Sequence, residues 1–112
     1  MQLNKLAAHL EAKAKAKKTA YYSDIAAHFG LPPLDGAWNS HPLCAAFDAL
    51  DRQDADAKRP FRTSVVVAKG SNMPGPGYFS SLAALKGILT SNDSQRIEAF
   101  SHELNAAMAY PW

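Results

Sequence analysis

The sequence predicts an α+β fold that is mainly helical, with about five helices around a small two- or three-stranded antiparallel sheet. Five stretches carry apolar residues at intervals of three and four, the spacing of one helix face. One run, at positions 63–67, is rich in β-branched residues, and the densest cluster of Gly and Pro follows it at positions 70–77. With 112 residues, of which 47% are hydrophobic, the chain has the length of one globular domain spanning residues 1–112.

The first predicted element is an amphipathic helix over residues 2–18. Ala and Lys, which fill most of this stretch, are good helix formers. Its apolar stripe consists of Leu3, Leu6, Ala7, Leu10 and Ala14. Four lysines crowd its C-terminal end, at Lys13, Lys15, Lys17 and Lys18. The helix dipole favours cations there, and a nucleic-acid contact is the alternative interpretation of this cluster. The residues at positions 19–22 favour a short extended piece.

A short second helix and a long connection come next. Ser23 is a good N-cap for this helix, and Gly30 supplies its C-terminal stop. The side chains expected to face inward are Ile25, Ala26 and Phe29. Residues 31–40 form a connection, because two adjacent prolines cannot continue a helix and the pair Asp35-Gly36 marks a turn.

The third predicted helix is acidic. Ser40 caps it, and Pro42 is tolerated in its first turn because the N–H groups there have no partner within the helix. Its apolar face consists of Leu43, Phe47 and Leu50. Its acids are Asp48, Asp51, Asp54 and Asp56, which stand against Arg52, and the helix is expected to fray by residue 56.

Residues 61–69 predict a buried strand, around which the other elements are organised. The Gly- and Pro-rich residues 70–77 predict a long tight turn, and Tyr78-Phe79 predicts a short return. The antiparallel partner of the strand is either this return or residues 19–21. Val65 or Val66 must point inward, so an Asp at one of these positions should unfold the protein.

Two helices close the chain. Ser80 or Ser81 caps the first of them, and residues 90–93 break it and cap the next. The last helix spans residues 93–109, with an apolar stripe at Ile97, Phe100, Leu104 and Met108. The predicted core consists of Leu6, Leu10, Ile25, Phe29, Phe47, Leu50, Val65, Val67, Leu85, Ile97, Phe100 and Leu104.

The composition excludes several classes of protein. No apolar run approaches the roughly 18 residues of a membrane span. The sequence shows no signal peptide, so we expect a cytoplasmic monomer without a membrane partner. Cys44 is the single cysteine, which excludes an internal disulfide and a cysteine zinc site. The four histidines show no metal-ligand spacing, so we expect no metal and no cofactor.

One functional hypothesis comes from the order of the elements. The predicted elements follow the order of a winged helix: a helix, an extended piece, two helices, a strand, a turn and a return. In a winged helix the third helix enters the major groove of DNA. The wing would be the loop of residues 69–77. Four cations near this loop would contact phosphates, namely Lys58, Arg59, Arg62 and Lys69. The acidic third helix opposes this hypothesis, because its carboxylates repel a phosphate backbone.

The leading hypothesis is a non-enzymatic protein-interaction module with an unknown protein partner. The candidate surfaces are the acidic third helix and the loop at residues 69–77, in particular Ser71, Asn72, Met73 and Pro74. The same glycines and prolines also suit a rigid connector, so both interpretations of the loop stay open. Enzyme chemistry is not indicated. The loop lacks the Gly-Lys-Ser/Thr ending of a phosphate-binding loop, and Cys44 lies among apolar residues that disfavour a thiolate.

Two sets of residues resemble known families. Residues 19–30, Thr-Ala-Tyr-Tyr-Ser-Asp-Ile-Ala-Ala-His-Phe-Gly, resemble the opening of the DNA-binding half of alkylguanine-DNA alkyltransferases and alkyltransferase-like proteins. The Pro-Cys-His-Arg centre of that family is absent, so no alkyl-acceptor role carries over to Cys44. Three other stretches are similar to a pattern in small uncharacterised bacterial proteins. They are Tyr22-Ser-Asp-Ile-Ala, Val65-Val-Val-Ala-Lys and Met73-Pro-Gly-Pro-Gly-Tyr-Phe. That second resemblance implies a shared small bacterial domain without an established activity.

Overall fold

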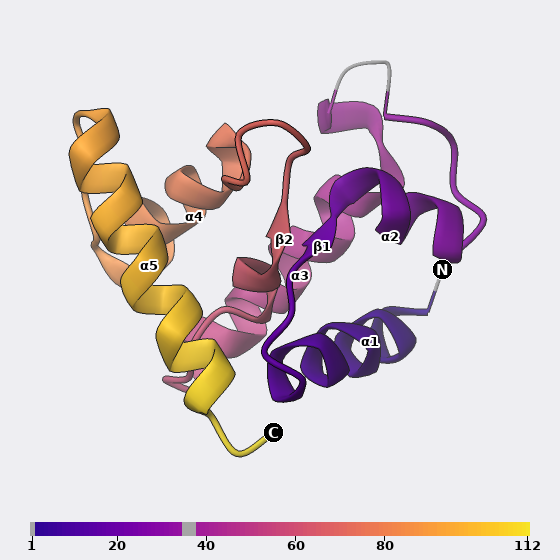
Figure 1. The fold of residues 1–112 in the computed structure, drawn as a ribbon, viewed down its shortest axis with the longest axis horizontal. Helices are drawn as coiled ribbons and strands as arrows, with labels where there is room; N and C mark the ends of the chain where they lie inside the picture. The colour runs from indigo at the N-terminus through magenta and orange to yellow at the C-terminus, as the bar shows by residue number, and fades with distance from the viewer. Residues whose placement is uncertain (1, 35–37) are drawn as a thin grey trace.

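Five α-helices and one pair of short strands make up the described part of the chain, residues 2–34 and 38–112, in the computed structural model (Figure 1). The elements are α1 (Leu3–Lys15), β1 (Ala20–Tyr21), α2 (Tyr22–His28), η1 (Trp38–Ser40), α3 (Pro42–Asp56), η2 (Arg62–Val65), β2 (Val66–Val67), α4 (Pro76–Lys86) and α5 (Asp93–Ala109), where η marks a 3-10 helix. The prediction of a mainly helical fold is confirmed. The turn expected at Asp35-Gly36 lies outside the described residues.

The two strands are parallel, which corrects the expected antiparallel sheet. Ala20 lies opposite Val66, and Tyr21 lies opposite Val67. A parallel pair needs a long crossover connection, and the chain between β1 and β2 supplies one through α2 and α3. Pairing therefore joins the chain before α2 to the chain after α3, and the Gly- and Pro-rich loop takes no part in the sheet.

The expected return strand belongs to α4. This helix begins at Pro76, well before the caps expected at Ser80 or Ser81. Gly75 is its N-cap, and Pro76 fits the first helical position because its φ is already helical and its missing N–H is not needed there. Since Tyr78 and Phe79 are helical, the described residues contain no β-hairpin after β2, and the winged-helix arrangement is not present.

The central segment, residues 61–67, is buried along its whole length but is mostly not a strand. η2 takes up its middle, and only Val66 and Val67 are paired as a strand. Distant carboxylates satisfy its backbone instead. Glu103 accepts from the amide of Phe61 at 3.1 Å, and Asp54 accepts from the amide of Arg62 at 2.8 Å. These side chains replace the ladder that a longer strand would need.

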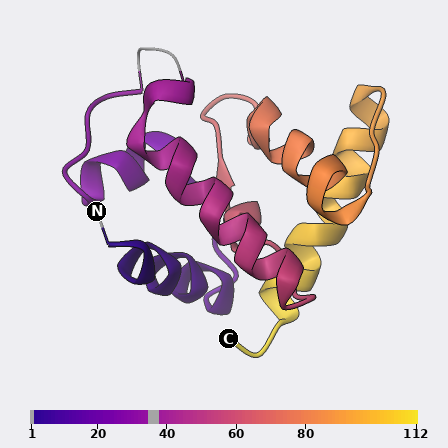
Figure 2. The ribbon, with the colours of Figure 1, turned by 180° about the vertical axis from the view of Figure 1, so that it is seen from behind.

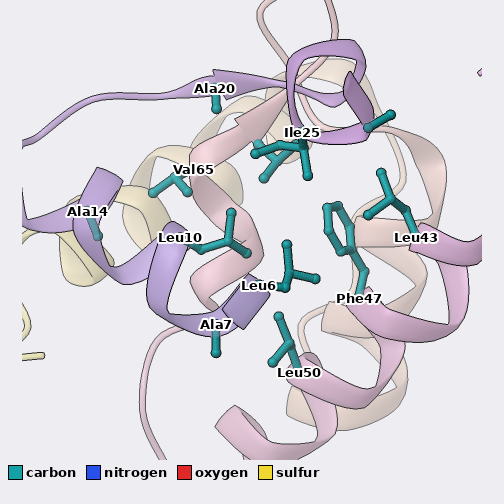
Figure 3. Close-up of a cluster of buried hydrophobic side chains, with 12 residues drawn as sticks. Leu6, Ala7, Leu10, Ala14, Ala20, Ile25, Leu43, Phe47, Leu50 and Val65 are labelled. Carbon is teal, nitrogen blue, oxygen red and sulfur yellow. The ribbon is translucent and has the colours of Figure 1, made fainter. Parts of the chain in front are cut away.

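The hydrophobic core has two clusters, and the central segment contributes to both. The first cluster packs α1, α2 and α3 around Val65 and Val66 (Figure 3). The second cluster consists of Phe61, Val67, Tyr78, Leu82 and Phe100. Because neighbouring side chains of the segment enter different clusters, this segment joins the N-terminal helices to α4 and α5.

Most of the predicted core is confirmed. The residues that are buried as predicted are Leu6, Leu10, Ile25, Phe47, Leu50, Val65, Val67 and Phe100. Phe29, Leu85 and Leu104 are partly buried against the clusters. Ile97 was predicted inside and is 54% exposed, which is a correction. Val65 and Val66 are both fully buried, whereas the sequence required only one of them to be.

Two helices have other N-cap residues than those predicted. α2 begins at Tyr22, before Ser23. α3 is capped by His41 rather than by Ser40, because Nδ1 of His41 accepts from the amide of Leu43 at 3.1 Å. Its Nε2 therefore carries the proton and donates to the carbonyl of Pro32 at 2.8 Å.

The helices α1, α3 and α5 all pack against η2, and their C-terminal ends lie at one end of the molecule (Figures 1 and 2). The loop that follows β2 lies at the opposite end, near the start of α4 (Figure 1). None of the described helices is long and apolar enough to cross a membrane.

Candidate functional site

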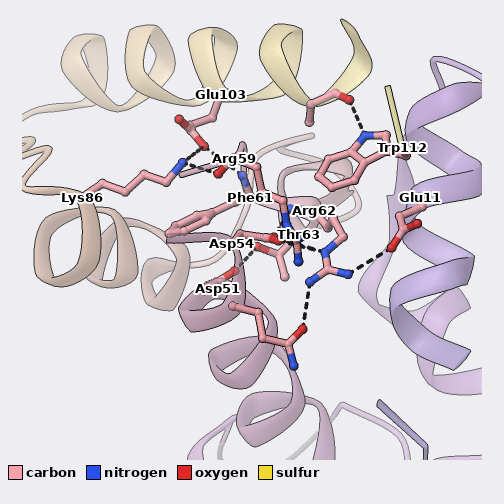
Figure 4. A network of polar contacts seen from close by, with 12 residues as sticks. Glu11, Asp51, Asp54, Arg59, Phe61, Arg62, Thr63, Lys86, Glu103 and Trp112 are labelled. Atoms are coloured by element: carbon pink, nitrogen blue, oxygen red, sulfur yellow. Dashed lines mark hydrogen bonds and ion pairs between the residues drawn. The ribbon is translucent and has the colours of Figure 1, made fainter. Parts of the chain in front are cut away.

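Arg62 lies inside the molecule, which corrects its expected position beside a DNA-binding wing. It is only 4% exposed, and its Nε lies 3.0 Å from Oδ1 of the fully buried Asp54. Its terminal nitrogens donate to Glu11 on α1 at 3.0 Å and to Gln53 on α3 at 3.1 Å (Figure 4). The guanidinium therefore holds α1, α3 and η2 together.

Arg59 shares the carboxylate of Asp54 with Arg62. Its Nε donates to Oδ1 of Asp54 at 2.6 Å. The indole of Trp112 lies against both arginines, with each guanidinium carbon 5.9 Å from the ring centroid (Figure 4). A buried carboxylate is tolerated when it is paired and hydrogen-bonded, and these two arginines supply that pairing. Most of the role of Arg59 is therefore structural.

The two remaining cations of the DNA hypothesis, Lys58 and Lys69, are exposed, and the central segment lies between them in the chain. Lys58 follows α3, and Lys69 follows β2, so they stand at the two ends of the central segment. Figure 1 shows η2 and β2 between the end of α3 and the loop that follows β2. The ammonium of Lys69 lies 5.4 Å from the ring centroid of Tyr21. The structure thus does not gather the four predicted cations on one face.

The predicted contact loop is held in place from both sides. Ser71 and Asn72 are exposed, Met73 is half-buried and Pro74 is buried. The amide of Asn72 donates to the carbonyl of Ala68 at 3.0 Å, and the amide of Ala68 donates to the carbonyl of Met73 at 2.9 Å. The amide of Gly75 donates to the hydroxyl of Tyr22 at 3.0 Å. The loop is a fixed connector that still presents part of its surface to solvent.

An apolar groove of about 710 Å³ runs between this loop, α4 and the start of α5. The apolar residues of the lining are Met73 and Pro74 of the loop, Pro76, Phe79 and Ala83 of α4, and Leu89 and Ile97 beyond it. The structure therefore brings two of the predicted contact residues together with side chains from two helices.

The apolar side chains at the far wall of the groove are largely uncovered. Leu89 is 79% exposed and Ile97 is 54% exposed. The polar groups of the lining pair with each other, since a guanidinium nitrogen of Arg96 lies 3.5 Å from the carboxylate of Asp93. The guanidinium carbon of Arg96 also lies 6.0 Å from the ring centroid of Phe79. The groove therefore offers apolar contact area with little net charge.

A buried polar layer fixes α4, the helix that forms the floor of the groove. Thr63 donates to Asp51 on α3 at 2.6 Å, and the side chain of Ser81 on α4 also hydrogen-bonds Asp51. Burial raises the pKa of Asp51 to about 7, although these two hydrogen bonds act in the opposite direction. The hydroxyls of Tyr78 and Ser64 lie 2.7 Å apart, and burial raises the pKa of Tyr78. These contacts anchor α4 to α3 and to the central segment.

The residues that the structure describes form no metal centre. Among them, no group of three or more His, Cys, Asp and Glu residues could hold a metal ion. Two histidines from different helices do meet, since the rings of His9 and His28 stack at 4.3 Å. Burial, His28 and Lys13 lower the pKa of His9. His41 uses both ring nitrogens near the start of α3, which leaves no free nitrogen as a base for Cys44.

The sequence analysis missed the groove because it followed helix periodicity too far. Ile97 is in phase with Phe100, so the stripe placed it in the core. The signal that was overlooked is Gly87, which ends α4 with a φ of 69°. Leu89 follows this helix end, so it lies on no helix face that the core could cover.

Comparisons with protein-family models, with curated proteins and with solved structures found no match for this chain. The two resemblances described from the sequence therefore stay predictions, and the function must be argued from the residues of the structure.

Proposed function

We propose that this protein is a non-enzymatic interaction module whose groove binds an amphipathic helix of a partner protein. The observation that carries the proposal is the exposure of Leu89 and Ile97, 79% and 54%, on the wall of a groove that Met73 and Pro74 also line. Large apolar side chains grouped around a hollow are typical of protein contact sites, whereas single exposed apolar residues are not.

The walls of the groove favour a helix over an extended peptide as the occupant. Most of the lining belongs to α4, to α5 and to the turn between them. The backbone groups within a helix are already hydrogen-bonded to each other, so these walls offer few partners to the backbone of an extended chain. A helix satisfies its own backbone and needs only to present apolar side chains.

The charges at the groove indicate that apolar burial supplies most of the binding energy. Asp93 and Arg96 pair with each other and leave no strong net charge to attract a partner. Binding should therefore weaken little when salt is added, because screening acts on net charges at the surface. This salt insensitivity separates the proposed site from one that binds phosphates.

Selection from a displayed library of helical peptides tests the proposal. We expect the enriched peptides to carry apolar residues at positions i, i+3 or i+4, and i+7. In NMR titrations they should shift the amide signals of residues 73–97 in the wild-type protein. Ile97→Asp should abolish their binding, because it places a charge in the apolar wall.

Ala84→Asp is the matched control, because it adds the same charge to an exposed position of α4 outside the groove lining. This variant should bind the selected peptides as wild type does. Failure to enrich any helical peptide, or shifts confined to other residues, would overturn the proposal. Self-association that Ile97→Asp abolishes would also overturn it, since the occupant would then be a second copy of the chain.

The alternative function from the sequence was DNA binding through a wing at residues 69–77. In the described residues this loop leads into α4 rather than into a return strand. The proposal therefore assigns the loop to the apolar groove, to which it contributes Met73 and Pro74.

A further inference from the structure

A second surface, independent of the groove, lies where α1, α3 and α5 end. Figures 1 and 2 both show the C-terminal ends of these helices together at one end of the molecule. Four exposed lysines belong to two of these helix ends. Lys15 is the last residue of α1, Lys17 and Lys18 follow it, and Lys58 follows α3. We refer to these four residues as the lysine cluster.

Two members of the lysine cluster occupy equivalent positions in identical helix caps. Lys17 and Lys58 both have a φ of 56° and both follow the C-cap residue of their helix. In α1 the amide of Lys18 donates to the carbonyl of Lys13 at 2.9 Å. In α3 the amide of Arg59 donates to the carbonyl of Asp54 at 2.9 Å. This position favours Gly or Asn, yet the chain carries a lysine there twice.

The charge of the lysine cluster is not neutralised by neighbouring acids. None of its four members forms an ion pair with any residue in the described ranges. The nearby carboxylates of Glu11 and Asp54 are already bound by Arg62 and Arg59. Asp56, the last residue of α3, is an exposed acid at this end. The helix dipoles favour cations here but supply only a fraction of a charge each.

An aromatic pair belongs to the same end of the molecule. Tyr110 follows α5 and is 37% exposed, and its ring centroid lies 4.4 Å from that of Trp112. The indole N–H of Trp112 donates to the carbonyl of Ala107 at 2.7 Å, and Arg59 and Arg62 lie against its ring. Trp112 is therefore fixed, and it supports Tyr110 at the surface.

We propose that this end of the molecule binds single-stranded nucleic acid, with the lysine cluster on the phosphates and Tyr110 stacked on a base. Lysines supply point charges for a flexible backbone, and an exposed ring supplies a face for an unpaired base. A membrane surface fits less well, because the other large apolar side chains exposed in the described residues, Leu89 and Ile97, belong to the groove. A duplex offers no unpaired base for Tyr110.

Fluorescence anisotropy with a labelled oligothymidylate, at low and at physiological ionic strength, tests this assignment. We expect binding that weakens steeply with salt, as phosphate contacts require. Lys17→Asn with Lys58→Asn should weaken binding about tenfold, because two phosphate contacts are lost. Asn is chosen because it tolerates a positive φ, which keeps both helix caps intact. Tyr110→Leu should weaken binding about fivefold or more through the loss of stacking.

The matched control is Lys5→Gln with Lys69→Gln, which removes two exposed lysines outside the cluster. It should bind within about twofold of wild type if the contacts are local. Absence of binding at low salt, equal losses in the two double variants, or tighter binding of a duplex of equal length would each overturn the assignment. Thermal melts of all variants, matching wild type, show that any loss is not caused by unfolding. Ile97→Asp should bind the oligonucleotide normally, which separates this surface from the groove.

Discussion

The central segment is buried by the fold, whereas the wall formed by Leu89 and Ile97 is left exposed. Every residue from 61 to 67 is buried, and no buried side-chain nitrogen or oxygen in the described ranges lacks a hydrogen-bond partner. Leu89 and Ile97 are as apolar as the core, yet both remain more than half exposed. The first region is closed by contacts from several elements, whereas the second is left open.

The difference separates a region that is stabilised by buried contacts from a region that stays open to contacts from outside. The central segment receives α1, α3 and α5, together with a carboxylate from each of these helices. In the turn between α4 and α5, by contrast, Leu89 is 79% exposed. Loss of one group from the central segment should therefore be costly, while loss of an apolar group from the open wall should change the stability little.

The largest effect is expected from Val66→Asp. Val66 is fully buried in the first hydrophobic cluster and pairs with Ala20 in the sheet. A carboxylate there would lie among the apolar side chains of this cluster, and its burial costs several kcal/mol against a total stability of about 5–15 kcal/mol. Circular dichroism should show no cooperative thermal transition.

Val65→Asp should behave in the same way, because Val65 is also fully buried. Leu89→Asp, which introduces the same charge on the open wall, should melt as wild type does. If the variants at positions 65 and 66 melt at the wild-type temperature, the central segment is no more sensitive to a charge than the open wall is.

The next effect in size is expected from Asp54→Ala. This change removes the shared partner of Arg59 and Arg62 and leaves the amide of Arg62 without its acceptor. Breaking a buried ion pair on one side typically costs about 3–5 kcal/mol, because the remaining charge stays buried. Urea denaturation followed by circular dichroism measures the difference.

Asp48→Ala is the control, because Asp48 is exposed and pairs with Arg52 one helical turn away. It should leave the free energy of unfolding unchanged within error. Equal losses in the two variants would show that the network around Asp54 is no stronger than a surface pair.

These buried contacts also explain which parts of the fold the sequence could predict. Leu6, Leu10 and Phe100 were placed correctly, because helix periodicity is a local pattern that depends on nothing distant. The strand at residues 61–69 was predicted too long, because its backbone is satisfied by Asp54 and Glu103. The second of these follows the segment by about forty positions, and a local pattern carries no information about such a partner.

An intermediate effect that depends on pH is expected from Asp51→Asn. The pKa of Asp51 is raised from 3.8 to about 7 in the folded protein, so the native state binds the proton more tightly than the unfolded chain. The stabilisation of the folded state by the protonated carboxyl of Asp51 is fully present below pH 3.8. It is lost as the pH rises toward about 7. Asn stays neutral and can accept the hydrogen bond from Thr63, so the variant should lack this loss.

The measurement is the free energy of unfolding of both proteins across this pH range. The two should agree near pH 4, and the variant should become the more stable by about 1.4 kcal/mol for each pH unit up to about pH 7. Above that pH the difference should stay constant. A difference that does not change with pH would mean that Asp51 is ionised throughout and that the polar layer under α4 is more accessible to water.

The candidate site was only partly accessible from the sequence. Met73 and Pro74 were singled out because Gly- and Pro-rich loops often carry contacts, and both line the groove. Arg62 was misplaced, because a cation beside a loop and a cation beneath a helix pair look the same in sequence. Ile97 was misplaced because a helix stripe shows which side chains share a face, but not how far along the helix the core extends to cover that face.

The smallest effect is expected from Ile97→Ser, and it sharpens the comparison most directly. Ile97 is 54% exposed and its neighbour in the wall, Leu89, is 79% exposed, so truncation removes little buried area. We expect a change in the free energy of unfolding within about 0.5 kcal/mol. Leu82→Ser is the paired measurement, because Leu82 is fully buried on α4, beneath the same groove, and its loss should cost about 2–5 kcal/mol. If both variants lose the same stability, the wall is part of the packed core and the groove is not an open contact site. If only Leu82→Ser is destabilised, the wall contributes little to the stability of the fold, which is what the proposed contact site requires.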